Sequence, residues 1–224
     1  MEKVDFDNYA DNYDEIMNNQ LSSFEDDVSY FAEYKIIETK KRLETLPNKI
    51  LDFGCGVGRN INFIEKHFEN AKLFGCDISS KSIQQARREI KNATFFELGN
   101  DLISEKFDLI FISNVFHHIA VNERQNVIKD QIIPLLNDNG NLIVFEHNPF
   151  NPVTRYLVAT CPFDKDAVLL YKRELKRLLK KNNLNFIGDA FTLFFPSVFK
   201  RLRPLEKYLK YIPLGGQYYV HFKK

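Results

Sequence analysis

The residues best suited to chemistry lie where short apolar runs of the sequence end. The first such run carries Asp52 and passes directly into Gly54, Gly56 and Gly58. Glycine is needed where the backbone adopts φ > 0 or approaches a ligand closely, so three alternating glycines predict a turn that presents bare backbone to a flat ligand. The helix expected just after this loop would add free amide groups, which can hold an anion.

The spacing of these glycines separates two classes of ligand. Dinucleotide-binding folds use G-x-G-x-x-G, whereas here the glycines alternate and Asp52 lies two positions before the first of them. A carboxylate at that position would repel a pyrophosphate, but it suits a ligand that carries an ammonium and a sulfonium group. The segment resembles motif I of the class I S-adenosylmethionine-dependent methyltransferases, which is an acidic residue followed by x-G-x-G-x-G.

Further motifs of this family follow in the family's order. The run 72–78 contains Asp77, about 20 residues past the loop, where nucleotide-binding α/β folds place a carboxylate on ribose hydroxyls. Residues 106–119 resemble the fourth-strand motif, F-D-x-[IV] followed by [LF]-H-H-[IVL]. Residues 6–14 resemble the segment F-x-x-x-A-x-x-Y-D, which folds over the cofactor in many small-molecule methyltransferases. The resemblance covers roughly residues 5–150 and implies S-adenosyl-L-methionine as cofactor.

The adenine pocket is where the sequence departs from the family pattern. The family often has Gly-Asp after its third strand, whereas this chain has Gly99-Asn100-Asp101. Either Asn100 or Asp101 could accept a hydrogen bond from the adenine amino group, and Asp101 is preferred because a carboxylate acts only as an acceptor. The cofactor contacts that the resemblance implies are Tyr13, Asp52, Gly54, Cys55, Gly56, Gly58, Asp77, Ile78, Asn100, Asp101 and Asn114.

Three histidines follow predicted strands and should lie on the rim that binds ligands: His117, His118 and His147. Methyl transfer from a sulfonium depends mainly on positioning, but a hydroxyl acceptor also benefits from a base, a role that histidine suits. We expect His118 or His147 to be that base; the structural alternative is one ring satisfied in the core and one exposed. No Asp or Glu at a recognisable spacing joins these histidines, so no metal is predicted.

The insertion that follows the fifth predicted strand points to the acceptor. Its H-N-P-F-N-P run, residues 147–152, is similar to methyltransferases of bacterial surface-polysaccharide clusters. This similarity implies O-methylation of a small polar or anionic acceptor, such as a sugar, a sugar nucleotide, or a phosphate or phosphoramidate precursor of a surface glycan. We expect this acceptor to contact Tyr9, Asn148 and Arg155, with the Arg155 guanidinium donating two parallel hydrogen bonds to an anionic group. The prolines predict an irregular loop at the rim.

These residues must be positioned by alternating strands and helices. Such alternation predicts an α/β fold, a doubly wound and mostly parallel seven-stranded sheet, in which the resemblance implies a reversed last strand. Helices are expected up to about Arg42 and at 60–68, 79–90, 122–136 and 171–181, with an amphipathic basic helical stretch at 196–213. Strands are expected at 49–53, 72–77, 93–97, 107–113, 140–146, 184–193 and 217–223.

One methyltransferase domain over 1–224 accounts for all of these elements. It divides into an N-terminal helical cap (1–45), a cofactor-binding core (46–146) and two insertions on the substrate side (147–170 and 196–213). The apolar stripe of the second insertion could pack on the sheet, contact a membrane surface or form a dimer contact.

Composition limits the other classes of protein to which this sequence could belong. A hydrophobic content of 44% with 27% charged residues is ordinary for a globular domain, and no apolar run reaches the ~18 residues of a membrane span. Without a signal-peptide pattern, a cytoplasmic protein is expected. Cys55, Cys76 and Cys161 have neither disulfide nor zinc spacing.

Charge is uneven along the chain, which bears on its partners. The first 40 residues hold eleven acidic and three basic residues, and residues 172–224 hold thirteen basic and three acidic ones. We interpret these as solvated faces, with the alternative that the basic C-terminal part faces an acidic or phosphorylated substrate. A nucleic-acid surface is not expected, and we expect a small-molecule substrate and a monomer or homodimer. Two other classes stay open: a non-catalytic S-adenosylmethionine-binding partner subunit and, less favoured, an NAD-dependent oxidoreductase.

Overall fold

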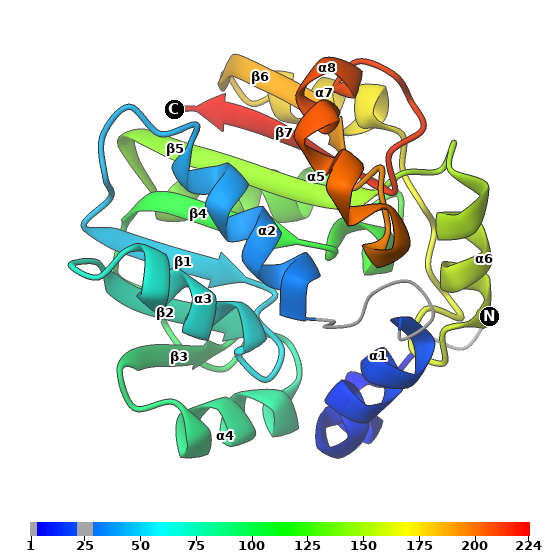
Figure 1. The fold of residues 1–224 in the computed structure, drawn as a ribbon. Helices are drawn as coiled ribbons and strands as arrows, with labels where there is room; N and C mark the ends of the chain where they lie inside the picture. Colours follow the sequence, from blue (N-terminus) through cyan, green and yellow to red (C-terminus); the bar gives the residue numbers. More distant parts are fainter. Residues whose placement is uncertain (1–3, 22–28) are drawn as a thin grey trace.

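A seven-stranded sheet with the order β3-β2-β1-β4-β5-β7-β6 forms the centre of the molecule (Figure 1). The computed structural model describes residues 4–21 and 29–224, apart from the side chains of residues 11, 13 and 14. The strands are β1 Lys49–Phe53, β2 Lys72–Asp77, β3 Ala93–Glu97, β4 Phe107–Ser113, β5 Leu136–His147, β6 Asn185–Thr192 and β7 Gln217–Lys223. β1 to β5 are parallel, and β7 runs antiparallel to β5 and β6, which confirms the predicted doubly wound sheet with its reversed last strand.

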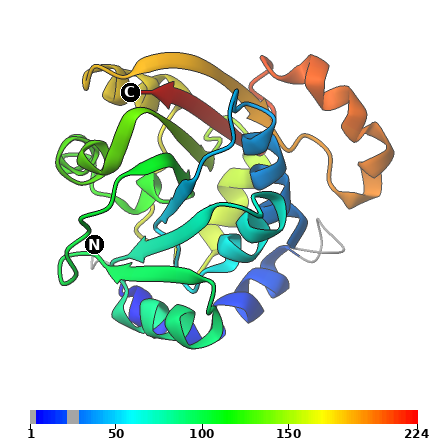
Figure 2. The ribbon, with the colours of Figure 1, turned by 90° about the vertical axis from the view of Figure 1, so that its left-hand side faces the viewer.

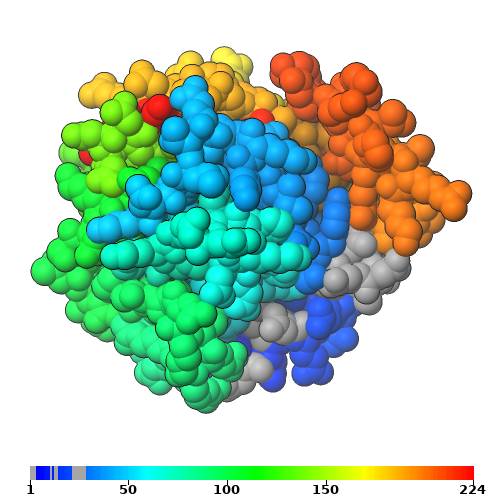
Figure 3. Space-filling view, turned by 60° about the vertical axis from the view of Figure 1, so that its left-hand side comes forward, coloured from blue at the N-terminus to red at the C-terminus, as the bar shows by residue number. Residues whose placement is uncertain are grey.

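Helices cover both faces of this sheet. The α-helices are α1 Tyr13–Leu21, α2 Ser29–Lys40, α3 Arg59–His67, α4 Ser80–Glu89, α5 Arg124–Asn126, α6 Pro152–Thr160, α7 Lys172–Lys180 and α8 Glu206–Leu209. Shorter or irregular helical turns are η1 Phe6–Asn8, η2 Ala10–Asn12, η3 Phe116–His118, η4 Val127–Ile132, η5 Ile133–Leu135 and η6 Ser197–Leu205. α2, α3 and α4 bury apolar residues in the core of one face. Figure 3 shows α2 (blue) and α3 (cyan) lying against each other on the outside of that face. η4 and α7 do so on the other face.

The predicted helix 122–136 is a composite of three turns. α5 passes into η4, a π-helical segment, and then into the 3₁₀ turn η5, which contains Pro134. Proline lacks an amide proton and cannot continue an α-helical ladder, so the chain leaves the helix here. β5 therefore begins at Leu136, earlier than predicted, and resumes regular pairing with β4 only at Asn141, after Asn139 at φ +63°.

The expectation of an irregular loop after β5 is wrong for its second half. Residues 152–160 form α6, with Pro152 at its first position and Asn151 as its N-cap. Asn151 accepts a hydrogen bond from the Thr154 amide at 3.0 Å. Proline is well tolerated at the first helical position because the amide it lacks has no intrahelical partner, so Asn-Pro starts this helix rather than preventing it.

The helical stretch 196–213 is confirmed as η6 and α8, but it does not pack its apolar stripe on the sheet. It forms a protrusion at one corner of the molecule, drawn in orange in Figure 2. Val198 is 79% exposed and Tyr208 is 70% exposed. Glu206 anchors the stretch by accepting hydrogen bonds from the amides of Phe194 and Phe195. Among the described helices none has the length and apolar character that crossing a bilayer requires.

Candidate functional site

The carboxyl ends of the parallel strands open into a cavity of about 720 Å³. Its walls come from the ends of β1, β2, β4 and β5, from the N-terminal segment with α1, and from α6 and the loop after it. A doubly wound sheet places its ligands there, where the strand order reverses between β1 and β4. The cavity brings together most, but not all, of the residues that the sequence singles out.

The three glycines of the loop after β1 have different tasks. All have positive φ, +76° at Gly54, +53° at Gly56 and +87° at Gly58. A β-carbon on Gly54 would lie 2.4 Å from Val115 Cγ2, and one on Gly58 would lie 2.5 Å from Ile90 Cδ1, whereas Gly56 has open space. The expectation that all three bare one side of the turn holds for two of them: Gly54 and Gly56 line the cavity, whereas Gly58 is buried and permits close packing behind the loop.

Asp77 lies at the end of β2 and is joined to the glycine loop. Its Oδ2 accepts a hydrogen bond from the Gly56 amide at 2.8 Å, and its Oδ1 accepts one from the Ser79 amide at 2.9 Å. Burial raises the pKa of Asp77, and these amides act against that shift. Because a carboxylate has about four acceptor positions, Asp77 can accept further bonds from a ligand in the cavity, which it lines beside Ile78.

Asp52 is a fully buried carboxylate with one unused oxygen, and it is not itself part of the cavity lining, to which its neighbours Phe53 and Asn60 contribute. Its Oδ2 accepts a hydrogen bond from Asn60 Nδ2 at 3.2 Å, while its Oδ1 has no hydrogen-bond partner among the described residues. Burial raises the pKa of Asp52 to about 7, Asn60 and Lys35 act to lower it, and the nearby Asp77 raises it further. A buried polar atom without a partner costs free energy, and a cationic ligand group would supply the missing donor.

Lys35 is a site residue that the sequence analysis missed. It lies on α2, lines the cavity, and donates from Nζ to Ser113 Oγ at 2.7 Å. Burial lowers its pKa to about 8, nearby Arg59 lowers it further, and Asp52 and Glu146 oppose both. A lysine in the middle of a helix carries no sequence signal for such a position, because only the packing of α2 on the sheet brings it to the strand ends.

Two further predicted cofactor residues line the cavity. Asn114 follows β4 at φ +59°, and its Oδ1 accepts a hydrogen bond from Gln217 Nε2 at 3.4 Å. Cys55 is buried in the glycine loop, and burial raises the pKa of its thiol well above the usual value. Cys55 is therefore a neutral lining side chain rather than a nucleophile.

The residues predicted for the adenine group are not brought into the cavity. Asp101 is on the outer surface, where it accepts hydrogen bonds from Arg87 Nη2 at 2.6 Å and from the Glu97 amide at 2.8 Å. Asn100 is exposed and donates to the Glu97 carboxylate. Leu98, just before them, does line the cavity. The side chain of Tyr13 lies outside the described part of the structure.

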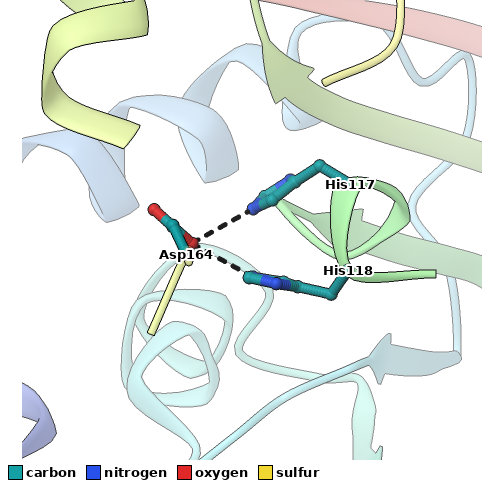
Figure 4. A group of neighbouring side chains, drawn as sticks. All are labelled: His117, His118 and Asp164. Carbon is teal, nitrogen blue, oxygen red and sulfur yellow. Dashed lines mark ion pairs between the residues drawn. The ribbon is translucent and has the colours of Figure 1, made fainter. Parts of the chain in front are cut away.

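The histidine rings gather at the acceptor side of the cavity. His117 Nδ1 lies 2.7 Å from Glu146 Oε2, and its ring centroid lies 4.1 Å from that of His118 and 4.9 Å from that of His147. Asp164 Oδ1 lies 3.6 Å from His117 Nε2 and 3.3 Å from His118 Nε2, as the dashed lines in Figure 4 mark. The three predicted histidines therefore form one cluster with two carboxylates.

Burial and the carboxylates of Glu146 and Asp164 together determine the charge on each histidine ring. Burial acts to lower the pKa of His117, but Glu146 and Asp164 outweigh it and raise that pKa to about 9. Burial and the positive charge on His117 lower the pKa of His118 to about 4 and that of His147 to about 3. At neutral pH the cluster thus holds one cationic ring and two neutral rings that can accept a proton.

Asp164 and Glu146 are the acidic residues that the spacing argument did not find. Glu146 accepts hydrogen bonds from the amides of Val115 and Phe116 at 2.9 and 2.6 Å, which fixes it beneath His117. Asp164 follows α6, far along the chain from His118. Its contact with the histidines depends on the path of that loop, so no local spacing could have indicated it.

Of the three residues predicted to contact the acceptor, one lines the cavity and two do not. Tyr9 lines it and donates its hydroxyl to the Pro162 carbonyl at 3.2 Å. Asn148 is buried outside the lining, where its Nδ2 donates to the carbonyls of Pro213 and Gly215. Arg155 is exposed on α6 and also lies outside the lining. Neither is placed to touch an acceptor in the cavity.

Similarity to known proteins agrees with this geometry. A family model described as a methyltransferase domain matches residues 51–142, from β1 into β5. An uncharacterized protein of Haemophilus influenzae is 27% identical over 205 residues, covering 80% of this chain and 78% of that protein.

One further sequence match and one solved structure are named as methyltransferases. Ribosomal RNA small subunit methyltransferase C of Haemophilus influenzae is 33% identical over 131 residues, which cover 53% of this chain but only 39% of that enzyme. The structure of the plantazolicin methyltransferase BpumL in complex with SAH superposes with a TM-score of 0.66 at 17% identity, covering 98% of this chain and 94% of that one. The matched segment and the sheet together support a class I S-adenosylmethionine-dependent methyltransferase.

Proposed function

We propose that this protein binds S-adenosylmethionine at the glycine loop and methylates a hydroxyl oxygen of an acceptor held beside the histidine cluster. The observation that carries the proposal is a pair of buried carboxylates near the ends of the neighbouring strands β1 and β2. Asp77 lines the cavity and accepts a hydrogen bond from the Gly56 amide, and Asp52 has one oxygen without a partner among the described residues. Two acidic groups suit a cationic ligand with ribose hydroxyls and oppose a pyrophosphate. The SAH bound to BpumL supports the same ligand class.

The roles of the chain's residues follow from their contacts. Asp52 has a free oxygen for an ammonium group, and Asp77, held by two backbone amides, can accept from two adjacent hydroxyls. The open face at Gly56 lets a ligand approach the backbone. When bound, S-adenosylmethionine supplies an electrophilic methyl group on sulfur.

His147 is the proposed base of the reaction. It follows β5 and lines the cavity, and its ring is neutral at pH 7, so a ring nitrogen is free to accept a hydrogen bond from an acceptor hydroxyl and to take its proton as the bond to the methyl carbon forms. Burial and the charge on His117 lower its pKa to about 3, which makes it a weak base. His118 also lines the cavity, but its Nε2 is directed at Asp164, which leaves it less suited to contact an acceptor. Positioning of the acceptor supplies most of the remaining rate enhancement.

The lining of the acceptor side favours a neutral, partly apolar acceptor. Phe31, Leu157, Phe163 and Phe195 contribute apolar surface to the cavity, whereas Arg155, the predicted anion ligand, lies outside it. A sugar hydroxyl on such a molecule keeps the surface-glycan hypothesis within the proposal. An acceptor phosphate would have to be recognised by the cationic residues that do line the cavity, Lys35, Arg59 and His117, and not by Arg155.

Titration calorimetry and an acceptor screen test the proposal separately. Binding of S-adenosylhomocysteine with no binding of NAD is expected, and the reverse would mean an oxidoreductase. A mass-spectrometric screen of neutral sugars, glycolipid precursors and phosphorylated metabolites should then give a methyl-sized gain for a hydroxyl compound. Cofactor binding without transfer to any acceptor class would favour a non-catalytic partner subunit.

A further inference from the structure

We infer that His117, His118 and Asp164 form a binding site for a divalent transition-metal ion such as Zn²⁺ on the acceptor side of the cavity. The three ligating atoms all lie within 4.8 Å of one another, and all three residues line the cavity. Two imidazole nitrogens and one carboxylate oxygen are a donor set used by metal sites that keep open positions for a substrate.

The two distances from Asp164 to the histidine nitrogens match a coordination shell better than hydrogen bonds. Metal–ligand bonds of ~2.0–2.2 Å in a tetrahedron place neighbouring donors roughly 3.3–3.5 Å apart. Asp164 Oδ1 lies 3.3 Å from His118 Nε2 and 3.6 Å from His117 Nε2. A charge-assisted hydrogen bond would be about 2.7–2.9 Å long, as on the other side of His117, where Nδ1 lies 2.7 Å from Glu146.

Glu146 supplies the support that metal-binding histidines need. A ligating histidine normally donates its other ring N–H to a carboxylate, which fixes the tautomer and directs the free nitrogen to the metal. Glu146 accepts from His117 Nδ1 and is itself held by the amides of Val115 and Phe116, so His117 Nε2 faces Asp164, and a bound ion would replace the proton on Nε2. His118 is held by packing, with the Phe6 ring at 4.9 Å in an edge contact.

The chemical role of the ion rests on the proposed function, whereas the binding site does not. An ion at this position would bind the acceptor hydroxyl and favour its deprotonation, with the proton passing to His147. The oxygen lone pair then forms the bond to the methyl carbon, and the electron pair of the breaking C–S bond stays on sulfur. This restricts the acceptor to molecules whose hydroxyl, alone or with a neighbouring oxygen, can ligate a metal.

Cobalt titration of tag-free, chelator-treated protein tests the site directly. One equivalent of Co²⁺ should bind, with the visible absorption of a four- or five-coordinate ion, and Zn²⁺ should displace it. Asp164→Asn and His118→Gln should weaken binding beyond roughly 100-fold, the upper end of what a supporting residue costs. Glu146→Gln should weaken it by about 10- to 100-fold while one site remains.

Asp166→Asn is the matched control for Asp164. Asp166 lies on the same loop, accepts a hydrogen bond from the Val4 amide at 2.9 Å and is not one of the proposed ligands, although its charge acts on His118. Its loss should therefore reduce cobalt affinity far less than the loss of Asp164. Equal cobalt binding by the wild-type protein and Asp164→Asn would overturn the site. Calorimetry with S-adenosylhomocysteine on each variant reports folding independently. Metal binding without S-adenosylhomocysteine binding would instead contradict the proposed function and leave the metal site intact.

Discussion

The backbone amide of Gly56 donates a hydrogen bond to the carboxylate of Asp77 at 2.8 Å, so the glycine loop and the end of β2 form one unit. The same carboxylate holds the Ser79 amide at the start of the next helix. Asp77 thus both shapes the loop and faces the ligand, and substituting it should affect ligand binding in two ways.

Asp77→Ala should weaken binding of S-adenosylhomocysteine by about 1.5–3 kcal/mol, because two ribose hydroxyls lose an ionised acceptor. Titration calorimetry measures the change. Asp101→Ala is the matched control, since Asp101 lies outside the cavity and pairs with Arg87. If Asp101→Ala weakened binding as much as Asp77→Ala, the assignment of the ribose site would be wrong.

Cofactor affinity should increase with pH around neutrality because of Asp52. Burial raises its pKa to about 7, and only the ionised form attracts an ammonium group. Affinity should therefore rise about tenfold between pH 6 and pH 8 as the carboxylate ionises. Calorimetry at these two pH values checks this, and Asp52→Asn should bind more weakly with no such pH dependence. A wild-type affinity independent of pH would exclude Asp52 as the ammonium ligand.

The buried Asp52 carboxylate should also lower the stability of the cofactor-free protein at neutral and basic pH. Its folded-state pKa lies above the unfolded value, so its contribution to stability is present in acid and is lost as the pH rises toward 7. Asp52→Asn should consequently raise the melting temperature of the free protein at pH 8, by ~2–4 °C for each kcal/mol recovered. At pH 4 the two proteins should melt much closer together; an equal gain at both pH values would point to packing rather than charge.

Replacing the proposed base should slow transfer without affecting cofactor binding. His147→Ala is expected to reduce turnover by roughly 100-fold or more while the affinity for S-adenosylhomocysteine stays near that of the wild type. His67→Ala, which removes a histidine paired with Glu33 away from the cavity, serves as control. Full activity in His147→Ala would show that positioning alone drives the reaction.

Substitution of Asn148 should reduce the stability of the fold, whereas substitution of Arg155 should change neither stability nor acceptor binding. Asn148→Ala removes a buried side chain that joins the turn before α6 to the carbonyls of Pro213 and Gly215, and should cost about 2–4 kcal/mol in urea unfolding. Arg155→Lys, on the exposed face of α6, should change neither stability nor the KM of the acceptor. A rise in that KM with Arg155→Lys would restore the anionic acceptor.

Local sequence patterns were sufficient for much of the fold. The strands at 49–53, 72–77, 93–97, 107–113 and 217–223 have the predicted bounds, because each is a short run rich in apolar or aromatic residues, and all but the edge strand 93–97 are largely buried. Asp52, Gly56 and Asp77 could be found for the same reason, since strand ends determine their places.

What the sequence could not show depends on contacts between distant segments. Lys35 and Asp164 reach the cavity only through the packing of α2 and the loop after α6. Asp101 matched a motif approximately, but a local bond to the Glu97 amide and an ion pair with Arg87 hold it outside. Helix α6 was not predicted because proline disrupts the interior of a helix. At the first helical position, where Pro152 lies, proline is instead compatible with helix formation.

The N-terminal segment connects the two halves of the cavity. On the cofactor side, Asp7 accepts hydrogen bonds from Ser79 Oγ at 2.6 Å and from the Lys81 amide at 3.2 Å. On the acceptor side, Tyr9 bonds to the Pro162 carbonyl, close to Asp164. One short stretch of chain is therefore bonded both to the loop after β2 and to the loop that carries Asp164, so any displacement of this stretch would loosen both sides of the cavity at once.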